Sequence, residues 1–121
     1  MKALLDTNIL IDYLNGIEEA REEIHRYQAP LISPISWMEV MAGARPEEEN
    51  KIRRFLARFR QVEIDGAIAE IAVAIRRTHR IRLPDAIIWA SAKQAGALLV
   101  SRNFRDFPAD EPGVRVPYEV H

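Results

Sequence analysis

The sequence predicts an α/β domain with a central, mostly parallel sheet of four to five short strands flanked by helices. Short apolar runs recur along the chain, and each has the length of a buried strand rather than of a helix. Segments with apolar residues three and four positions apart lie between these runs, as expected for helices that cover a sheet. The 121 residues fit one domain, residues 1–121, and suffice for a core without disulfides or a structural metal.

Five of the apolar runs are expected to form strands. They cover residues 3–5, 30–33, 62–64, 97–101 and 114–116. Helices are expected to begin between them, near residues 7, 18, 36, 46, 66 and 84. The helix that begins at Pro46 is expected to be long, because its apolar stripe continues to Phe59. We favour core packing for this stripe over a docking groove for a partner peptide.

The charge and the cysteine content exclude several classes of protein. A formal net charge of −1 and a pI of about 6.3 are not those of a strong nonspecific DNA-binding protein. The absence of cysteine excludes disulfides, zinc–thiolate sites and thiol catalysis. No apolar run approaches the roughly 18 residues of a membrane span, and the first run meets Asp6 too early for a signal peptide. We therefore expect a cytoplasmic protein without a membrane segment.

Two acidic residues occupy positions where α/β proteins bind ligands. Asp6 directly follows the first strand, and ligands of parallel sheets bind beyond the carboxyl ends of the strands. Its alternative role is to cap the next helix, which contributes about 1 kcal/mol. Asp85 follows Pro84 in the first turn of a largely apolar helix, so that we expect it near the same edge of the sheet. Its alternative role is to stabilise the helix dipole.

Glu39 is a carboxylate in an apolar segment. Its neighbours from Ile35 to Ala42 are almost all apolar, which predicts a helix buried nearly all round. An isolated carboxylate in such a helix is costly unless it is paired or binds a metal. No basic residue lies one turn away on either side. The alternative is that Glu39 points to solvent through a gap in the surface.

Acids that converge at one edge of the sheet would favour a hard cation. Mg²⁺ and Mn²⁺ prefer carboxylate oxygens and retain several waters, and such an ion activates water for phosphodiester hydrolysis. Ser101, Arg102 and Asn103 follow the clearest strand, and either Asn103 or the later Asp106 is placed to reach the pocket. A local turn is the favoured role for Asp106 when it is taken alone. The three histidines stand apart, and the chain has neither a glycine-rich phosphate loop nor a Gly-x-Ser-x-Gly segment.

Four segments resemble, in order, the motifs of the PIN-domain family, specifically the VapC-type toxins of bacterial toxin–antitoxin pairs. They are LLDTNILID at residues 4–12, ISWMEVMAG at 35–43, LPDAIIWA at 83–90 and LVSRNFRDF at 99–107. The resemblance spans nearly the whole chain and implies a three-layer PIN fold. It implies Mg²⁺ or Mn²⁺ bound through Asp6, Glu39 and Asp85, and an endoribonuclease that cuts RNA. It further implies a homodimer and inhibition by a cognate VapB-type antitoxin.

The resemblance also suggests roles for residues around the three acids. Polar residues expected to support the acids or the metal-bound waters are Thr7, Asn8, Ser36, Ser101 and Asn103. Many relatives carry an aspartate where Asn103 stands, so Asp106 is the expected fourth catalytic acid. Arginines expected to position the RNA backbone, through the planar guanidinium, are Arg80, Arg82 and Arg102.

Other functions of an α/β domain with an acidic pocket fit the sequence less well than a nuclease. A receiver domain needs a lysine after a late strand, and none of the three lysines stands there. A haloacid-dehalogenase-like phosphatase needs a second aspartate two residues after the first, where this chain has Asn8. A non-catalytic PIN-like module that binds RNA or protein is the main alternative, because the fourth acid departs from the family pattern.

Overall fold

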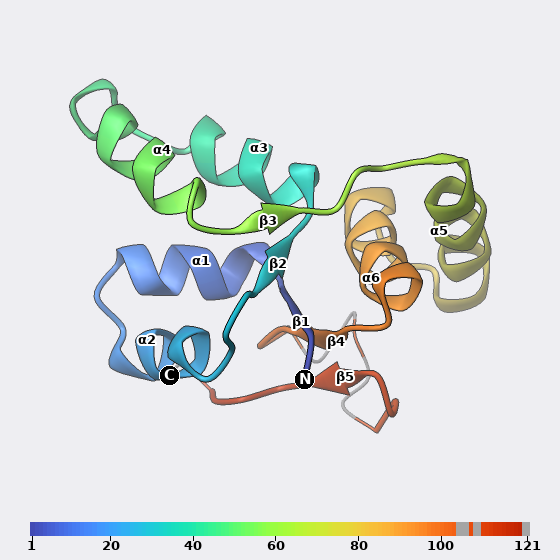
Figure 1. Cartoon of the computed structure of the whole chain (residues 1–121). Coiled ribbons are helices and arrows are strands. Elements are labelled where there is room, and N and C mark those ends of the chain that lie inside the picture. Colours follow the sequence, from blue (N-terminus) through green and yellow to red (C-terminus); the bar gives the residue numbers. More distant parts are fainter. Residues whose placement is uncertain (104–106, 108–109, 120–121) are drawn as a thin grey trace.

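The structure, a computed structural model, describes residues 1–103, 107 and 110–119 (Figure 1). Within these residues five strands form one sheet in the order β3-β2-β1-β4-β5, and each neighbouring pair is parallel. The strands are β1 (Ala3–Leu5), β2 (Leu31–Ile32), β3 (Arg60–Gln61), β4 (Leu98–Val100) and β5 (Val114–Arg115). The predicted parallel sheet of four to five short strands is therefore confirmed.

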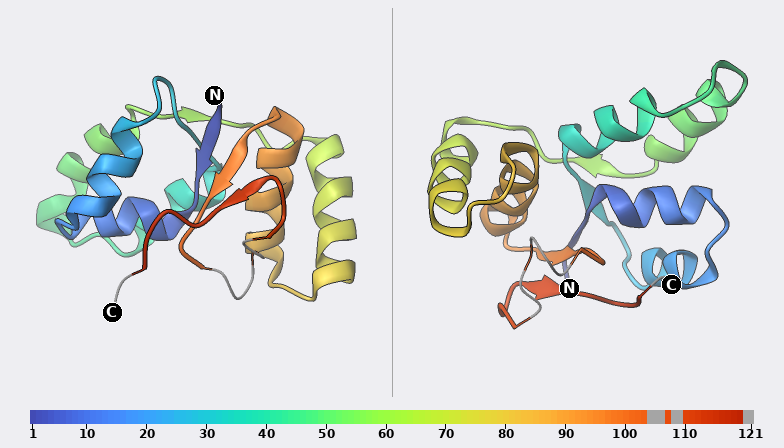
Figure 2. Two further views of the ribbon diagram at one scale, coloured as in Figure 1. Left: turned by 90° about the horizontal axis from the view of Figure 1, so that it is seen from below. Right: turned by 180° about the vertical axis from the view of Figure 1, so that it is seen from behind.

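Helices cover both faces of the sheet. They are α1 (Thr7–Leu14), α2 (Glu18–His25), α3 (Pro34–Ala42), α4 (Glu49–Leu56), α5 (Gly66–His79) and α6 (Leu83–Ala95), with a 3₁₀ turn η1 (Pro46–Glu48) before α4. Helices α5 and α6 lie together on one face, and α1 to α4 lie on the other (Figures 1 and 2). In the described part of the chain, no helix has the length and apolar character needed to cross a membrane.

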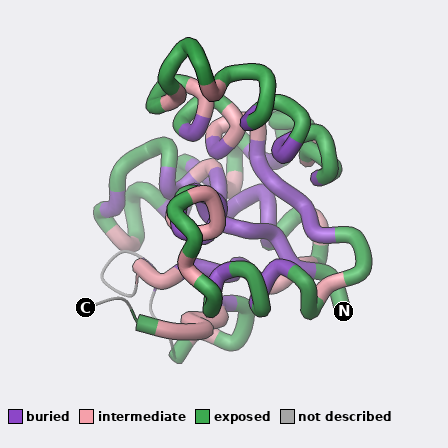
Figure 3. Tube along the Cα trace, turned by 90° about the vertical axis from the view of Figure 1, so that its left-hand side faces the viewer, coloured by how far each residue is buried: buried purple, intermediate pink, exposed green. Residues whose placement is uncertain are grey.

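The central strands β1 and β2 are buried on both faces, and β4 nearly so, which explains why these three strands are apolar at every position rather than at alternate ones. Leu4 and Leu99 pack with α5 and α6 in one core cluster. Leu5 and Val100 point to the other side and pack with residues of α1 to α4 in a second cluster. The buried trace accordingly runs through the middle of the molecule, between two exposed outer layers (Figure 3). The three layers follow directly from this two-sided burial.

Two predicted elements differ from the structure. The strand expected at residues 62–64 is β3 at Arg60–Gln61, an edge strand with both residues exposed. Its position is set by backbone pairing with β2, because Val62 donates a hydrogen bond to the Ile32 carbonyl at 3.0 Å just beyond it. The long helix expected from Pro46 to Phe59 is a 3₁₀ turn followed by α4, which ends at Leu56. Phe59 is nevertheless buried, so the stripe packs in the core as favoured.

A buried carboxylate ties α2 to the sheet. Glu23 is 4% exposed and accepts hydrogen bonds from Arg115 Nε at 2.7 Å and Nη2 at 3.0 Å, and from the Tyr27 hydroxyl at 2.6 Å. Burial raises the pKa of Glu23, but the bonds from Arg115 and Tyr27 outweigh it, so the pKa lies below its ordinary 4.5. We call Glu23, Arg115 and Tyr27 the Glu23 cluster. It joins α2 to the edge strand β5.

The lowered pKa of Glu23 gives a pH-dependent stability prediction. Because the ionised form is favoured in the folded state, it contributes stability above about pH 4.5, and this contribution is lost as the pH falls through the lowered pKa. We expect Glu23→Gln to reduce the free energy of unfolding at neutral pH by on the order of 2 kcal/mol. Urea unfolding at several pH values checks this. The difference from the unsubstituted protein should narrow below about pH 4.5, and a difference independent of pH would contradict the assignment.

Candidate active site

A hollow of about 300 Å³ lies at the carboxyl edge of the sheet. The three acids predicted from the sequence line it, although they come from three different elements. Asp6 follows β1, Glu39 lies on α3 and Asp85 lies in the first turn of α6. The other lining residues are Thr7, Asn8, Ile11, Arg82 and Asn103. The fold thus brings to one pocket carboxylates that lie far apart along the chain.

Asp6 is held from two sides. Its side chain is 4% exposed, and Oδ1 accepts the Thr7 backbone N–H at 2.7 Å, so that Asp6 caps α1. Oδ2 accepts the Ser101 hydroxyl at 2.7 Å and the Asn8 amide at 3.3 Å. The two roles considered for Asp6, helix cap and pocket acid, therefore coexist. Because β1 and β4 are neighbouring parallel strands, the residue that follows each lies beside the other.

Glu39 is held through Thr7. The Thr7 hydroxyl lies 2.7 Å from Glu39 Oε1 and 2.9 Å from the Ser36 hydroxyl. A hydroxyl has one hydrogen, and the charged carboxylate is the stronger acceptor, so we assign the Thr7 hydrogen to Glu39 and the Ser36 hydrogen to Thr7. Ser36 is fully buried. Thr7 thereby joins α1 to the acid of α3.

The predicted burial of α3 is wrong. Only Ser36 and Val40 of this helix are buried, while Met38 is half exposed and Glu39 lies at the surface. The alternative, in which the carboxylate reaches solvent, is the one observed. A helix with apolar residues on nearly all sides is therefore not necessarily surrounded by protein. Glu39 reaches the pocket from its open side, without the cost of burial.

Asp85 is paired with an arginine at the mouth of the pocket. Its side chain is buried, and Arg82 Nε donates to Oδ2 at 3.3 Å. The Arg82 side chain is 78% exposed, so this ion pair is open to solvent and weak. Arg80 lies at the exposed end of α5 in the left-handed conformation, with φ 57°, and does not line the hollow.

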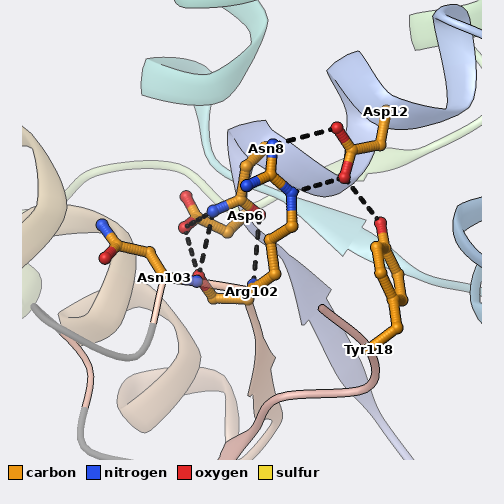
Figure 4. A network of polar contacts seen from close by, with 7 residues as sticks. Asp6, Asn8, Asp12, Arg102, Asn103 and Tyr118 are labelled. Atoms are coloured by element: carbon orange, nitrogen blue, oxygen red, sulfur yellow. Dashed lines mark hydrogen bonds and ion pairs between the residues drawn. The ribbon is translucent and has the colours of Figure 1, made fainter. Parts of the chain in front are cut away.

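Arg102 does not lie where an RNA-binding residue was expected. Its guanidinium binds Asp12 through two hydrogen bonds, of 2.6 Å from Nε and 3.1 Å from Nη2 (Figure 4). Its guanidinium is therefore engaged by a buried carboxylate, and its expected contact with RNA stays a prediction. No role was predicted for Asp12 from the sequence. The one feature of the sequence that could have pointed to it is its position as an acid next to the apolar face of α1. Asp106 lies outside the described residues.

The electrostatics of the pocket connect the acids. Burial raises the pKa of Asp6 to about 6, although the hydrogen bonds from Ser101 and Thr7 oppose this shift. The negative charges of Asp85 and Glu39 raise it further. The ionised acids therefore destabilise one another in the protein alone. A pocket of this kind favours a positive charge.

The sequence of the chain matches the PIN domain model over residues 3–109. The chain belongs to the PIN-domain family. Among curated proteins, no significant match is found.

Solved structures share the PIN fold over nearly the whole chain. A chain of a toxin–antitoxin complex from Klebsiella pneumoniae is 44% identical, with 98% of this chain and 99% of that chain covered and a TM-score of 0.92. A chain of DNA-bound VapBC from Salmonella typhimurium is 27% identical, with 95% and 96% covered and a TM-score of 0.78. FitAcB from Neisseria gonorrhoeae, 22% identical with 98% and 99% covered and a TM-score of 0.76, shares the fold alone.

The donor set of this PIN domain fits a hard divalent cation. The pocket offers carboxylate, hydroxyl and amide oxygens and neither thiol nor imidazole, which suits Mg²⁺ or Mn²⁺. Among the described residues, no three His, Cys, Asp or Glu side chains are placed to hold an ion directly. Glu39 is turned to Thr7, and Asp85 to Arg82. The arrangement therefore fits an ion that keeps several waters, as Mg²⁺ does.

The raised pKa of Asp6 predicts a loss of stability at neutral pH. Because the ionised form is disfavoured in the folded state, stability decreases as the pH rises from about 4 to above 6. Asp6→Asn lacks this loss, so we expect the variant to gain on the order of 2 kcal/mol relative to the unsubstituted protein between about pH 4 and about pH 7.5. Urea unfolding in EDTA at both pH values measures the change. Any pH-independent effect of the amide on stability cancels when the two pH values are compared. The same difference in unfolding free energy between variant and unsubstituted protein at both pH values would contradict the raised pKa of Asp6.

Proposed function

We propose that this PIN domain is a divalent-cation-dependent endoribonuclease and the toxin of a toxin–antitoxin pair. One observation carries the proposal: Asp6, Glu39 and Asp85, from three separate elements, line one pocket at the carboxyl edge of the sheet. The 44% identical chain from a toxin–antitoxin complex supports the toxin assignment. We further propose that residues 1–121 form a single nuclease domain that acts in the cytoplasm.

Asp6, Glu39 and Asp85 would hold Mg²⁺ or Mn²⁺, in part through water. Such an ion lowers the pKa of a bound water and neutralises charge on the phosphate that is cleaved. The protein's own groups keep the acids in place, because Ser101 and the Thr7 amide bind Asp6, and the Thr7 hydroxyl binds Glu39. These bonds reduce the reorganisation needed when substrate arrives.

RNA would enter at the open side of the pocket. The guanidinium of Arg82 is exposed at the mouth and is placed to bind a phosphate once it leaves Asp85. Asn103 lines the hollow and carries a side-chain amide of the kind that donates to phosphate oxygens, whereas the Asn8 amide already donates to Asp6 and Ser101. Arg80, exposed at the end of α5, is a further candidate that does not line the hollow. A role for Asp106 as fourth acid rests on the family resemblance.

The partners follow from the toxin assignment. We propose that a VapB-type antitoxin binds the protein and blocks the pocket, and that the toxin is a homodimer. The antitoxin partner is supported by the similar structures, a toxin–antitoxin complex from Klebsiella pneumoniae and DNA-bound VapBC from Salmonella typhimurium. An acidic pocket favours an antitoxin segment that presents arginine or lysine.

Cleavage of RNA by the purified protein tests the activity. We expect Mn²⁺-dependent endonucleolytic cleavage that EDTA abolishes, and a loss of about 100-fold or more in Asp6→Asn and Asp85→Asn, because charge neutralisation at a cleaved phosphate supplies several kcal/mol.

Glu70→Gln is the matched control, since Glu70 is an exposed acid on α5 that does not line the pocket. It should cut at the rate of the unsubstituted protein. Cleavage by Asp6→Asn at that same rate would contradict the assignment of this pocket as the active site.

A non-catalytic RNA- or protein-binding module is the second candidate. It is favoured by the side-chain placement, in which no three described acids are set to hold an ion directly. Calorimetric titration with Mn²⁺ separates the two functions. A nuclease should bind Mn²⁺ in the unsubstituted protein and much more weakly in Asp85→Asn. A binding module should bind intact RNA equally well in EDTA and show no heat with Mn²⁺.

A further inference from the structure

Asp12 is the one charged residue of α1; it is buried and does not line the pocket. It is 2% exposed, and its carboxylate accepts two hydrogen bonds from Arg102 and a third, of 3.0 Å, from the Tyr118 hydroxyl. These residues come from α1, from the segment after β4 and from the segment after β5, and they meet in Figure 4. We call them the Asp12 cluster. Its bonds connect parts of the chain that the sheet alone does not hold together.

The Asp12 cluster continues to Asp6 through hydrogen bonds. The Arg102 backbone N–H donates to Asn8 Oδ1 at 3.4 Å. The Asn8 amide donates to Asp6 Oδ2 at 3.3 Å and to the Ser101 hydroxyl at 3.2 Å. Arg102 is therefore held at both ends. Its side chain binds Asp12, and its backbone N–H binds Asn8, a partner of Asp6.

The Ser101 hydroxyl uses all of its hydrogen-bonding capacity in this network. It donates its single hydrogen to Asp6 at 2.7 Å, and it accepts from the Asn8 amide and from the Asn103 backbone N–H at 3.0 Å. One donor and two acceptor positions are all that a hydroxyl has. The orientation of this group therefore depends on the backbone of residues 101–103.

That backbone leaves the sheet at Ser101. The Ser101 N–H still pairs with the Arg115 carbonyl at 3.0 Å, but β4 has ended at Val100. Beyond this point, the two charge-assisted bonds from Arg102 to the buried Asp12 are the strongest described anchor. Loss of this anchor would free residues 101–103 to shift relative to Asp6.

We propose that Asp12, Arg102 and Tyr118 are positioning residues for Asp6. They fix residues 101–103 so that Ser101 and Asn8 hold the Asp6 carboxylate for cation binding, and they link the segment after β5 to the pocket. The proposal rests on the proposed cation-dependent function. It assigns Arg102 a role besides the RNA contact expected from the sequence.

The Glu23 cluster supplies a matched control within the same chain. It has similar chemistry: a buried carboxylate, two bonds from one arginine and one from a tyrosine hydroxyl, with Arg26 Nε as a further ion-pair partner 3.7 Å away. None of its described side-chain bonds reaches a residue that lines the pocket. Asp12→Asn and Glu23→Gln therefore make similar changes. Arg115 of the Glu23 cluster contacts Ser101 only through its backbone carbonyl, in continuation of the β4–β5 pairing, whereas Arg102 belongs to the segment that leaves the sheet.

Calorimetric Mn²⁺ affinity is the main measurement. Both variants should lose thermal stability, but only Asp12→Asn should bind Mn²⁺ more weakly. We expect a loss of about 10-fold in affinity, because removing a residue that holds a metal ligand in place typically costs this much. Equal affinities in Asp12→Asn and Glu23→Gln would overturn the proposal. Tyr118→Phe and Tyr27→Phe, which remove one hydroxyl each, form a milder pair should Asp12→Asn fail to fold, and only Tyr118→Phe should lose affinity.

Amide hydrogen exchange in EDTA tests the positioning without a cation. The Arg102 and Asn103 amides should exchange faster in Asp12→Asn than in Glu23→Gln, because the anchor of residues 101–103 is lost. Unchanged exchange in Asp12→Asn would overturn the proposal. Absence of Mn²⁺ binding by the unsubstituted protein would instead contradict the proposed function, and the exchange result would still decide whether Asp12 fixes this segment.

Discussion

The parallel pairing of β1 with β4 is the constraint on which the pocket depends. Leu5 lies opposite Val100, so Asp6 and Ser101 leave the sheet side by side, and the Asp6 N–H donates to the Val100 carbonyl at 2.9 Å. Side chains alternate along a strand, so a shift of one residue would turn Asp6 away from Ser101 and would exchange the side chains that β1 presents to the two cores. The two core clusters on either face fix this register and thereby fix the site.

The pocket itself opposes folding. Asp6 and Asp85 are both buried acids, and burial of Asp6, together with the charge of Asp85, raises the pKa of Asp6 to about 6. Such a concentration of like charge is a local conflict of the kind found at functional sites, and it is tolerated because apolar burial elsewhere stabilises the fold. The hydrogen bonds around Asp6 belong to the same compromise, because they hold the acid in place while partly offsetting its burial.

Arginine has two different uses in this chain. Arg102 and Arg115 each form two hydrogen bonds to one buried carboxylate and so join segments distant in sequence. Arg82, in contrast, remains largely exposed with a single weak pairing. A planar guanidinium suits both uses, since it matches a protein carboxylate as well as a phosphate. Composition alone therefore does not separate a structural arginine from one that binds substrate.

The sequence by itself determined the parallel α/β fold, most element positions and the three acids of the pocket. Apolar runs mark strands that are buried on both faces, and an acid directly after such a strand must lie at the carboxyl edge. Only the tertiary structure decided that Glu39 is exposed, that β3 lies at Arg60–Gln61 and that Arg102 binds Asp12. The physical reason is the separation of the interacting residues along the sequence. A local pattern fixes which face of an element is apolar. The partner of a polar side chain is set by residues that meet only after folding, and Arg102 and Asp12 are 90 positions apart.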